Sequence, residues 1–154
     1  RDQNEIVQKM RALPPELLAS YFSTNYIIHV DDNDVVLNVN KRTPDVLNAL
    51  LHSQSKTSWA IVTAFNPYST QSPLAENQDR QQQLQAMLLT HGYQILPAVG
   101  KSEDGLWEEP SLLVLGISYA LAKSFGSCFQ QNAVVYGERD SLVELLFCDV
   151  EREE

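Results

Sequence analysis

Residues 59–69 read WAIVTAFNPYS, an almost uninterrupted apolar run followed by a loop of turn-forming residues. A short apolar run without polar alternation is typical of a strand that is covered on both faces. We therefore predict a central strand over 59–65. The polar residues that follow this strand are expected at its end, where side chains and helix termini converge and where ligands bind in open α/β sheets.

Helices and strands are predicted on both sides of this central strand. Thr43-Pro44 and Ser72-Pro73 each combine a capping residue with a proline suited to the first helical turn, and His91-Gly92 is typical of a helix end. These signals predict helices over about 44–53 and 73–90, with a shorter helix over 119–125. Strand-like runs lie at 26–30, 35–39, 93–99, 111–117, 133–136 and 142–147.

The order of these elements predicts an α/β fold, close to the border with α+β. We expect a single domain with a mixed, mostly buried sheet of about five to seven strands flanked by helices. The usual right-handed crossover predicts parallel pairing of the strands at 59–65 and 93–99. Pro97 cannot donate a hydrogen bond to a neighbouring strand, so the second of these strands is expected to lie at a sheet edge or to end near the proline.

The 154 residues suit one domain, which we assign to 21–148. Residues 1–20 are predicted to form a helical segment, interrupted by Pro14-Pro15, and 149–154 to form an acidic tail. Because the chain begins at Arg1 rather than Met, it leaves open whether other residues precede it.

Composition and charge exclude several classes of protein. The chain is 44% hydrophobic and 20% charged, as folded domains are, and it has no apolar run long enough to cross a membrane. A formal net charge of −9 disfavours nucleic acid as a partner, because phosphate binding depends on Lys and Arg. The two cysteines, Cys128 and Cys148, are too few for a disulfide framework and indicate the cytoplasm. We expect no cofactor and no metal.

Three polar clusters lie at the predicted ends of buried strands. The first is the loop at 66–69, the second lies in the first turns of the following helix, and the third is the segment at 107–111. Because adjacent residues of an extended chain face opposite sides, at most one of Glu108 and Glu109 is expected in a shared site. Two of these clusters also have a plain structural interpretation. Glu76 and Arg80 are four residues apart and can form an ion pair on a helix surface, and Trp107 with its neighbours can form a surface rim.

Several blocks of the sequence together resemble an uncharacterised bacterial family, domain of unknown function 3293. These blocks are WAIVTAFNPYS (59–69), ENQDR (76–80), GYQILPAVG (92–100), WEEPSLLVLGI (107–117) and FQQNAVVYG (129–137). The resemblance covers about residues 21–137 and implies a bacterial origin and a set of signature positions, but no reaction. The signature positions add Gln131 and Asn132 to the candidate site, and Pro67 and Ser111 are signature positions that are not counted as ligand-binding candidates. The full set of ligand-binding candidates is Asn66, Tyr68, Ser69, Glu76, Asn77, Arg80, Trp107, Glu108, Glu109, Gln131 and Asn132.

Three hypotheses on function remain open. The first is a binding module, in which Arg80, the Asn66 loop and a helix N-terminus hold a small anionic ligand or an acidic group of a protein partner. The second is a hydrolase, in which Glu76, Glu108 or Glu109 acts as a general base or binds a divalent cation. The third is a protein-interaction domain with an acidic surface, whose polar network only stabilises the fold. No catalytic residue can be assigned, and the sequence leaves the oligomeric state open.

Overall fold

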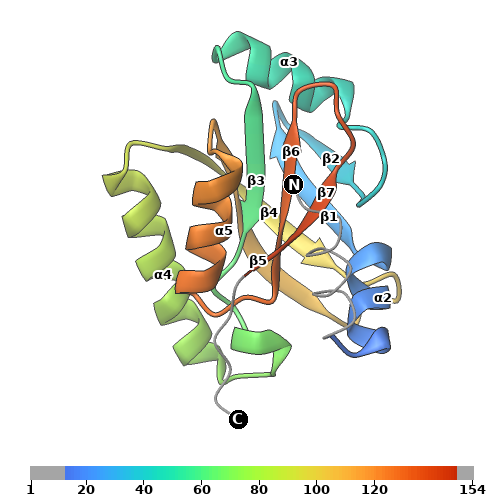
Figure 1. Cartoon of the computed structure of the whole chain (residues 1–154), viewed down its shortest axis with the longest axis vertical. Coiled ribbons are helices and arrows are strands. Elements are labelled where there is room, and N and C mark those ends of the chain that lie inside the picture. The colour runs from blue at the N-terminus through green and yellow to red at the C-terminus, as the bar shows by residue number, and fades with distance from the viewer. Residues whose placement is uncertain (1–12, 149–154) are drawn as a thin grey trace.

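The computed structural model describes residues 13–148, which form an antiparallel sheet with helices packed on it (Figure 1). The strands are β1 (Asn25–Val30), β2 (Asn33–Leu37), β3 (Ser58–Val62), β4 (Gln94–Lys101), β5 (Glu108–Leu115), β6 (Ala133–Glu138) and β7 (Glu144–Phe147). The helices are α2 (Pro15–Ser23), α3 (Asp45–Ser53), α4 (Leu74–Thr90) and α5 (Tyr119–Cys128), with a 3-10 turn, η1 (Pro67–Ser69). This arrangement confirms the predicted class, an α/β or α+β domain with helices flanking the sheet.

The middle of the sheet consists of two interlocked β-α-β units. The sheet order is β2-β1-β4-β5-β3-β6-β7, and all neighbouring strands are antiparallel. In β3-α4-β4 the two strands run in the same direction with β5 between them, and in β5-α5-β6 the intervening strand is β3. The succession β-α-β-β-α-β in this order is the ferredoxin-like topology.

The predicted parallel pairing of 59–65 with 93–99 is therefore wrong, and so is the mixed sheet. β5 follows β4 directly as its hairpin partner and lies between β4 and β3, pairing antiparallel with both. A crossover helix fixes only the relative direction of the strands that it joins, and it leaves room for a third strand between them.

β3 is buried on both faces, as its apolar run predicted. Ala60 and Val62 belong to the core on one face, whereas Trp59 and Ile61 belong to the core on the other. Strand geometry causes this division, because successive side chains point to opposite sides of a sheet. Both faces of β3 must therefore be covered by other parts of the chain.

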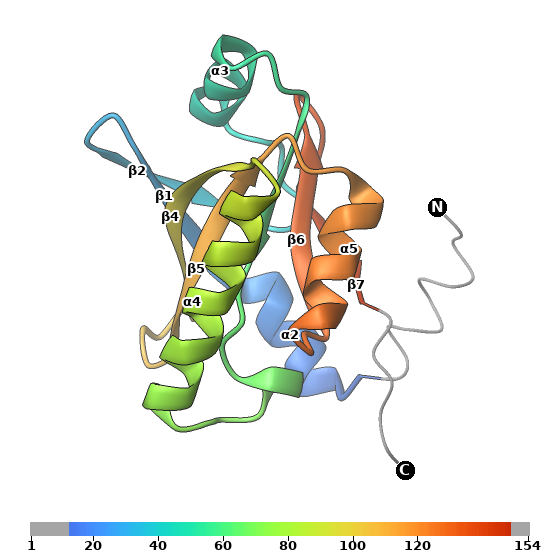
Figure 2. The ribbon, with the colours of Figure 1, turned by 90° about the vertical axis from the view of Figure 1, so that its left-hand side faces the viewer.

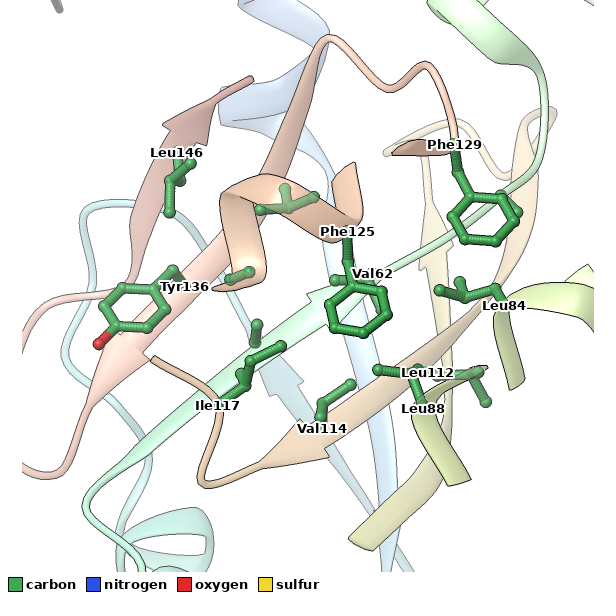
Figure 3. Packing of buried hydrophobic residues seen from close by; sticks show 14 of the residues in the cluster. Val62, Leu84, Leu88, Leu112, Val114, Ile117, Phe125, Phe129, Tyr136 and Leu146 are labelled. Carbon is green, nitrogen blue, oxygen red and sulfur yellow. The ribbon is translucent and has the colours of Figure 1, made fainter. Parts of the chain in front are cut away.

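One face of the sheet is covered by α4 and α5, which lie next to each other on it (Figure 2). Figure 3 shows Leu84 and Leu88 of α4 and Phe125 of α5 gathered over Val62 and Val114 of the sheet. All five side chains are at most 6% exposed. This packing fixes α4 against the end of β3, where the polar loop begins.

The opposite face of the sheet is concave and is covered at its two ends by α3 and α2 (Figures 1 and 2). Leu47 and Leu51 of α3 are fully buried among the side chains of this face. Leu17 and Tyr21 of α2 pack near Ala133 of β6. The space between α2 and the sheet contains the candidate site.

Several element boundaries differ from the predicted ones. β3 ends at Val62 rather than residue 65, and α5 continues through Gly126 to Cys128. Pro97 does not place β4 at an edge, because β4 lies between β1 and β5. The ladder between β1 and β4 nevertheless extends only to Ala98, so no strand on that side requires the missing N–H of Pro97.

The N-terminal and C-terminal predictions lie mostly outside the described residues. α2 occurs where a helical turn was predicted after the two prolines, but residues 1–12 of the predicted helical segment and the acidic tail at 149–154 are not described. Within 13–148, no helix has the length and apolar character that crossing a bilayer requires.

Candidate functional site

A cavity of about 380 Å³ lies on the concave face of the sheet. Its walls come from α2, β1, the loop after β3, the turn between β4 and β5, and β6. Its polar lining includes Asn66, Ser69, Glu109, Ser111 and Gln131, and its aromatic lining is formed by Tyr21, Tyr26 and Trp107. The volume falls within the range of roughly 300–1,000 Å³ that is common for small-molecule sites.

Side chains of α4 bind the backbone where β3 ends. The backbone N–H of Ala64 donates to Gln81 Oε1 at 2.8 Å, and Arg80 Nε donates to the carbonyl oxygen of Ala64 at 3.2 Å. Thr63 Oγ1 donates to the carbonyl oxygen of Pro110 at 2.8 Å. These side-chain bonds replace strand pairing, which explains why β3 ends before the predicted residue 65.

The next two residues are held in the same way, so that Asn66 is fixed at the cavity wall. Gln131 Nε2 donates to the carbonyl oxygen of Phe65 at 3.0 Å. The N–H of Asn66 donates to Asn77 Oδ1 at 2.9 Å, and Asn77 Nδ2 donates to Asn66 Oδ1 at 2.8 Å. Asn66 has a left-handed backbone conformation with φ of 50°, which an asparagine tolerates better than most residues. Asn66 and Asn77 are both buried.

Arg80 supports this loop and does not line the cavity. Its guanidinium donates to Asn77 Oδ1 as well as to the carbonyl oxygen of Ala64. Both contacts belong to the set of side-chain hydrogen bonds that holds residues 64–66, which we call the clamp. Glu76 is exposed on α4. The expected cleft is therefore shared by the Asn66 loop and the segment led by Trp107, but not by Arg80.

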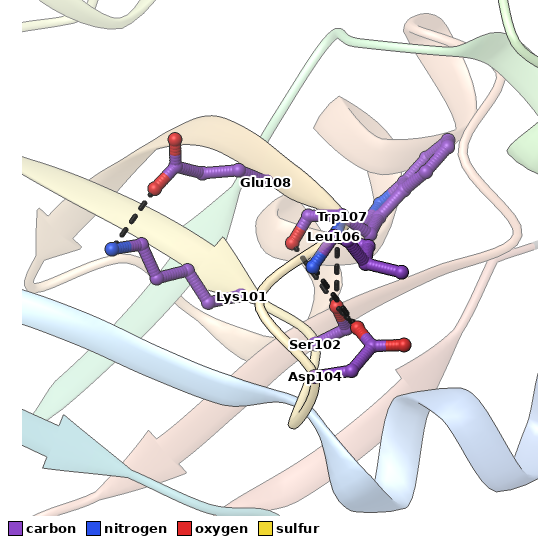
Figure 4. A network of polar contacts seen from close by, with 6 residues as sticks. All are labelled: Lys101, Ser102, Asp104, Leu106, Trp107 and Glu108. Carbon is purple, nitrogen blue, oxygen red and sulfur yellow. Dashed lines mark hydrogen bonds and ion pairs between the residues drawn. The ribbon is translucent and has the colours of Figure 1, made fainter.

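The two adjacent carboxylates separate as the extended chain predicts. Glu108 forms an exposed ion pair with Lys101 at 3.0 Å (Figure 4), whereas Glu109 lines the cavity. Trp107 Nε1 donates to Glu109 Oε2 at 2.7 Å. One carboxylate of the pair therefore lies in the site, and the other provides a matched surface control.

The turn between β4 and β5 is internally bonded, and this holds Trp107 beside the cavity. Ser102 Oγ accepts from the N–H of Trp107 at 3.0 Å and donates to Asp104 Oδ1 at 2.6 Å. Asp104 Oδ1 also accepts from the N–H of Leu106 at 3.0 Å (Figure 4). Hydrogen bonds from Ser102 and Leu106 lower the pKa of Asp104 below its usual value, so the turn keeps its charge to lower pH.

Glu109 is the charged group of the cavity. Burial raises its pKa above the usual value, and hydrogen bonds with Trp107 and Asn66 oppose that rise. Burial also raises the pKa of Tyr21 and of Tyr26, and the nearby charge of Glu109 raises both further. Glu109 thus faces two tyrosines that stay protonated at neutral pH.

The remaining predicted candidates, Tyr68, Ser69 and Asn132, lie in or next to the loop that follows β3. Ser69 lines the cavity, where its Oγ accepts from Asn132 Nδ2 at 3.0 Å and lies 3.1 Å from the hydroxyl of Tyr21. Tyr68 does not line the cavity, and its N–H donates to the carbonyl oxygen of Gln130 at 2.7 Å. Asn132 is buried behind Ser69 and connects β6 to the loop.

Sequence reasoning missed the aromatic wall formed by Tyr21 and Tyr26. A signal for Tyr26 was present, because Tyr26, Ile28 and Val30 alternate along β1 and share one face. Nothing in the sequence pairs α2 with the loop after β3, so Tyr21 carried no comparable signal. Its partner Ser69 is 48 residues away in the chain.

Within 13–148, the cavity is lined by no Lys, Arg or His. The same residues contain no group of three or more His, Cys, Asp or Glu side chains that could hold a metal ion. The arrangement is therefore that of a partly open, partly aromatic cavity whose described lining has one acidic side chain, Glu109.

The topology is that of a ferredoxin-like domain, to which α2 and the β1–β2 hairpin are added before the β-α-β-β-α-β unit. The cavity lies between α2 and this unit. Residues 62–134 match the model of the family described as Protein of unknown function (DUF3293). This stretch of the chain is therefore similar to the family that the sequence blocks resembled. No curated protein and no solved structure matches the chain.

Proposed function

We propose that the protein is a small-molecule-binding module whose ligand occupies the cavity under α2. The observation that carries the proposal is a partly open cavity of about 380 Å³ that Glu109, Asn66 and Ser69 line from separate elements. The clamp on residues 64–66 supports it, because a binding group must be held rigidly to select a ligand.

The ligand that suits this cavity differs from the small anion expected from the sequence. That expectation rested on Arg80, but Arg80 does not line the cavity, and its Nε and Nη2 donate to Ala64 and Asn77. Glu109 would repel a negative charge placed beside it. We therefore propose a neutral or positively charged ligand.

A bacterial origin and a cytoplasmic location are also part of the proposal. The origin rests on the family resemblance. The location rests on the low cysteine content, because Cys128 and Cys148 are too few for the disulfide framework that is common in secreted domains. The net charge of −9 supports a partner other than nucleic acid.

A fragment-library screen by ligand-observed NMR tests the binding proposal. We expect fragments that bind the wild-type protein and lose binding in Ser111→Leu, because Ser111 lines the cavity and is 7% exposed, so that a larger side chain fills the space. Glu108→Gln serves as the surface control and should bind as the wild type does. An absence of binders, or binding that persists in the filled cavity, would contradict the proposal.

A second candidate function is hydrolysis with Glu109 as general base. The raised pKa of Glu109 favours it, because a carboxylate with a higher pKa is a stronger base at neutral pH. Chromogenic esters and glycosides are suitable substrates. Turnover that falls at least about 100-fold in Glu109→Gln, but not in Glu108→Gln, is the expected result for a general base. Equal turnover in both variants would exclude this role.

A further inference from the structure

The charges around the cavity are unbalanced. Among the residues lining it that the structure describes, Glu109 is the single charged one. Its described hydrogen-bond partners are Trp107 and Asn66, both uncharged. The nearest basic side chain along the strand pair, Lys101, forms its ion pair with Glu108 instead. A half-buried carboxylate without a cationic partner is poorly compensated by the protein.

Aromatic side chains surround this carboxylate. Trp107 donates its indole N–H to Glu109, and Tyr21 and Tyr26 line the same cavity. The effect of the Glu109 charge on the pKa of each tyrosine agrees with their placement near it. The faces of tryptophan and tyrosine rings attract cations, so the ring wall and the carboxylate favour the same kind of ligand.

The rest of the lining is apolar. Leu17 of α2, Ile61 of β3 and Leu145 of β7 contribute aliphatic surface to the cavity. A ligand that fills this space therefore needs a hydrocarbon part as well as a polar head.

We propose that the cavity binds an organic amine, with its ammonium group on Glu109 and its alkyl or arylalkyl body against the aromatic and aliphatic walls. This inference rests on the proposed function and specifies its ligand class. A primary ammonium has three N–H donors, and Glu109 retains acceptor capacity after accepting from Trp107. The hydrogen bond between the ammonium group and the Glu109 carboxylate is charge-assisted, because both groups are ionised.

The pH dependence of binding follows from the groups that face Glu109. Tyr21 on α2 and Tyr26 on β1 have raised pKa values and stay neutral through the acidic and neutral range. Acidification therefore changes the charge of Glu109 alone among these three groups. Amine affinity should fall as the pH is lowered through the raised pKa of Glu109.

Three matched probes test the ligand class: 2-phenylethylamine, 2-phenylethanol and 3-phenylpropionate. We expect the amine to bind at least about 10-fold more tightly than the other two at neutral pH, a ratio expected for one charge-assisted hydrogen bond. Glu109→Gln should remove this preference, whereas Glu108→Gln and the charge-retaining Glu109→Asp should keep it. Chemical-shift perturbation of the Trp107 indole N–H reports on occupancy of the cavity.

The outcomes separate this inference from the proposed function. If the alcohol or the carboxylate binds as tightly as the amine, or if Glu109→Gln leaves the amine affinity unchanged, the ligand class is wrong but the cavity remains a binding site. If the amine still binds when Ser111→Leu fills the cavity, both proposals fail. If the amine does not bind at about 10 mM, where a ligand with a Kd near 1 mM saturates its site, the inference is overturned. The fragment screen then decides whether the cavity binds a small molecule of another class.

Discussion

Replacing Asn77 by alanine should destabilise the protein strongly, although Asn77 does not line the cavity. The change leaves the buried N–H of Asn66 without its acceptor and removes the acceptor of the Arg80 guanidinium. It also removes two donations from Asn77 Nδ2, to Asn66 Oδ1 at 2.8 Å and to the Ser72 carbonyl at 3.2 Å. An unsatisfied buried group costs about 1–3 kcal/mol, and each lost bond between satisfied groups costs about 1 kcal/mol or less. We expect a total loss of about 2–4 kcal/mol.

Thermal unfolding followed by circular dichroism measures this loss. For a chain of about this length, 1 kcal/mol corresponds to roughly 2–4 °C in Tm, so Asn77→Ala should melt about 4–16 °C below the wild type. Gln78→Ala, on the exposed side of the same helical turn, is the matched control and should change Tm by less than about 2 °C.

Asn77→Asp distinguishes the acceptor of Asn77 from its donor. An aspartate retains an oxygen for the N–H of Asn66 and for Arg80, so we expect a smaller loss than in the alanine variant. A Tm of Asn77→Ala within about 2 °C of the wild type would refute the reasoning. It would mean that the hydrogen bonds between Asn77 and Asn66 do not contribute to stability to this extent.

Three further predictions concern the core, the acidic pole and α2. Gly137→Ala places a Cβ about 2.5 Å from the ring of the fully buried Trp59 and should lower the free energy of unfolding by about 1–3 kcal/mol, measured by urea denaturation; an unchanged midpoint would contradict it. Because the pKa of Glu109 is raised in the folded state, the unfolded chain releases this proton first as pH rises above about 4, and stability falls through the interval between the two pKa values. The Tm of Glu109→Gln relative to the wild type should therefore rise with pH through this interval, and a difference that is constant with pH would count against burial of this carboxylate. Tyr21→Phe removes the hydroxyl contact with Ser69 and should cost about 1 kcal/mol and speed hydrogen exchange in α2, whereas unchanged exchange would show that this contact does not hold the helix.

Local patterns along the chain predicted most of the individual elements, because their signals are short in range. The apolar run at 59–65 identified β3, and the strand-like runs at 26–30 and 35–39 correspond to β1 and β2, which are joined by a turn where Asp31 and Asp32 have positive φ. The order of strands was not accessible in the same way. A helical crossover is compatible with zero or one strand between its ends, and only packing of the whole sheet decides between them.

The candidate site was predicted in part for the same reason. Glu109 and Asn66 were among the candidates because each follows or begins a buried strand, and both line the cavity. Strand alternation predicted that only one of Glu108 and Glu109 would do so. Arg80 was predicted as a ligand-binding residue because helical spacing gives the face on which a side chain lies but not its hydrogen-bond partners. Its partners prove to be the backbone of Ala64 and the side chain of Asn77.

The cavity has two walls that come from different parts of the chain: α2 and β1 form one, and the ferredoxin-like unit forms the other. Glu109 and Asn66 lie inside the stretch that matches the family, whereas Tyr21 and Tyr26 lie before it. Substitutions in α2 and β1 would therefore change the aromatic wall while leaving the acidic wall as it is. A shortened chain of residues 58–138 would retain the complete ferredoxin-like unit but would open Glu109 to water on the side that α2 now shields.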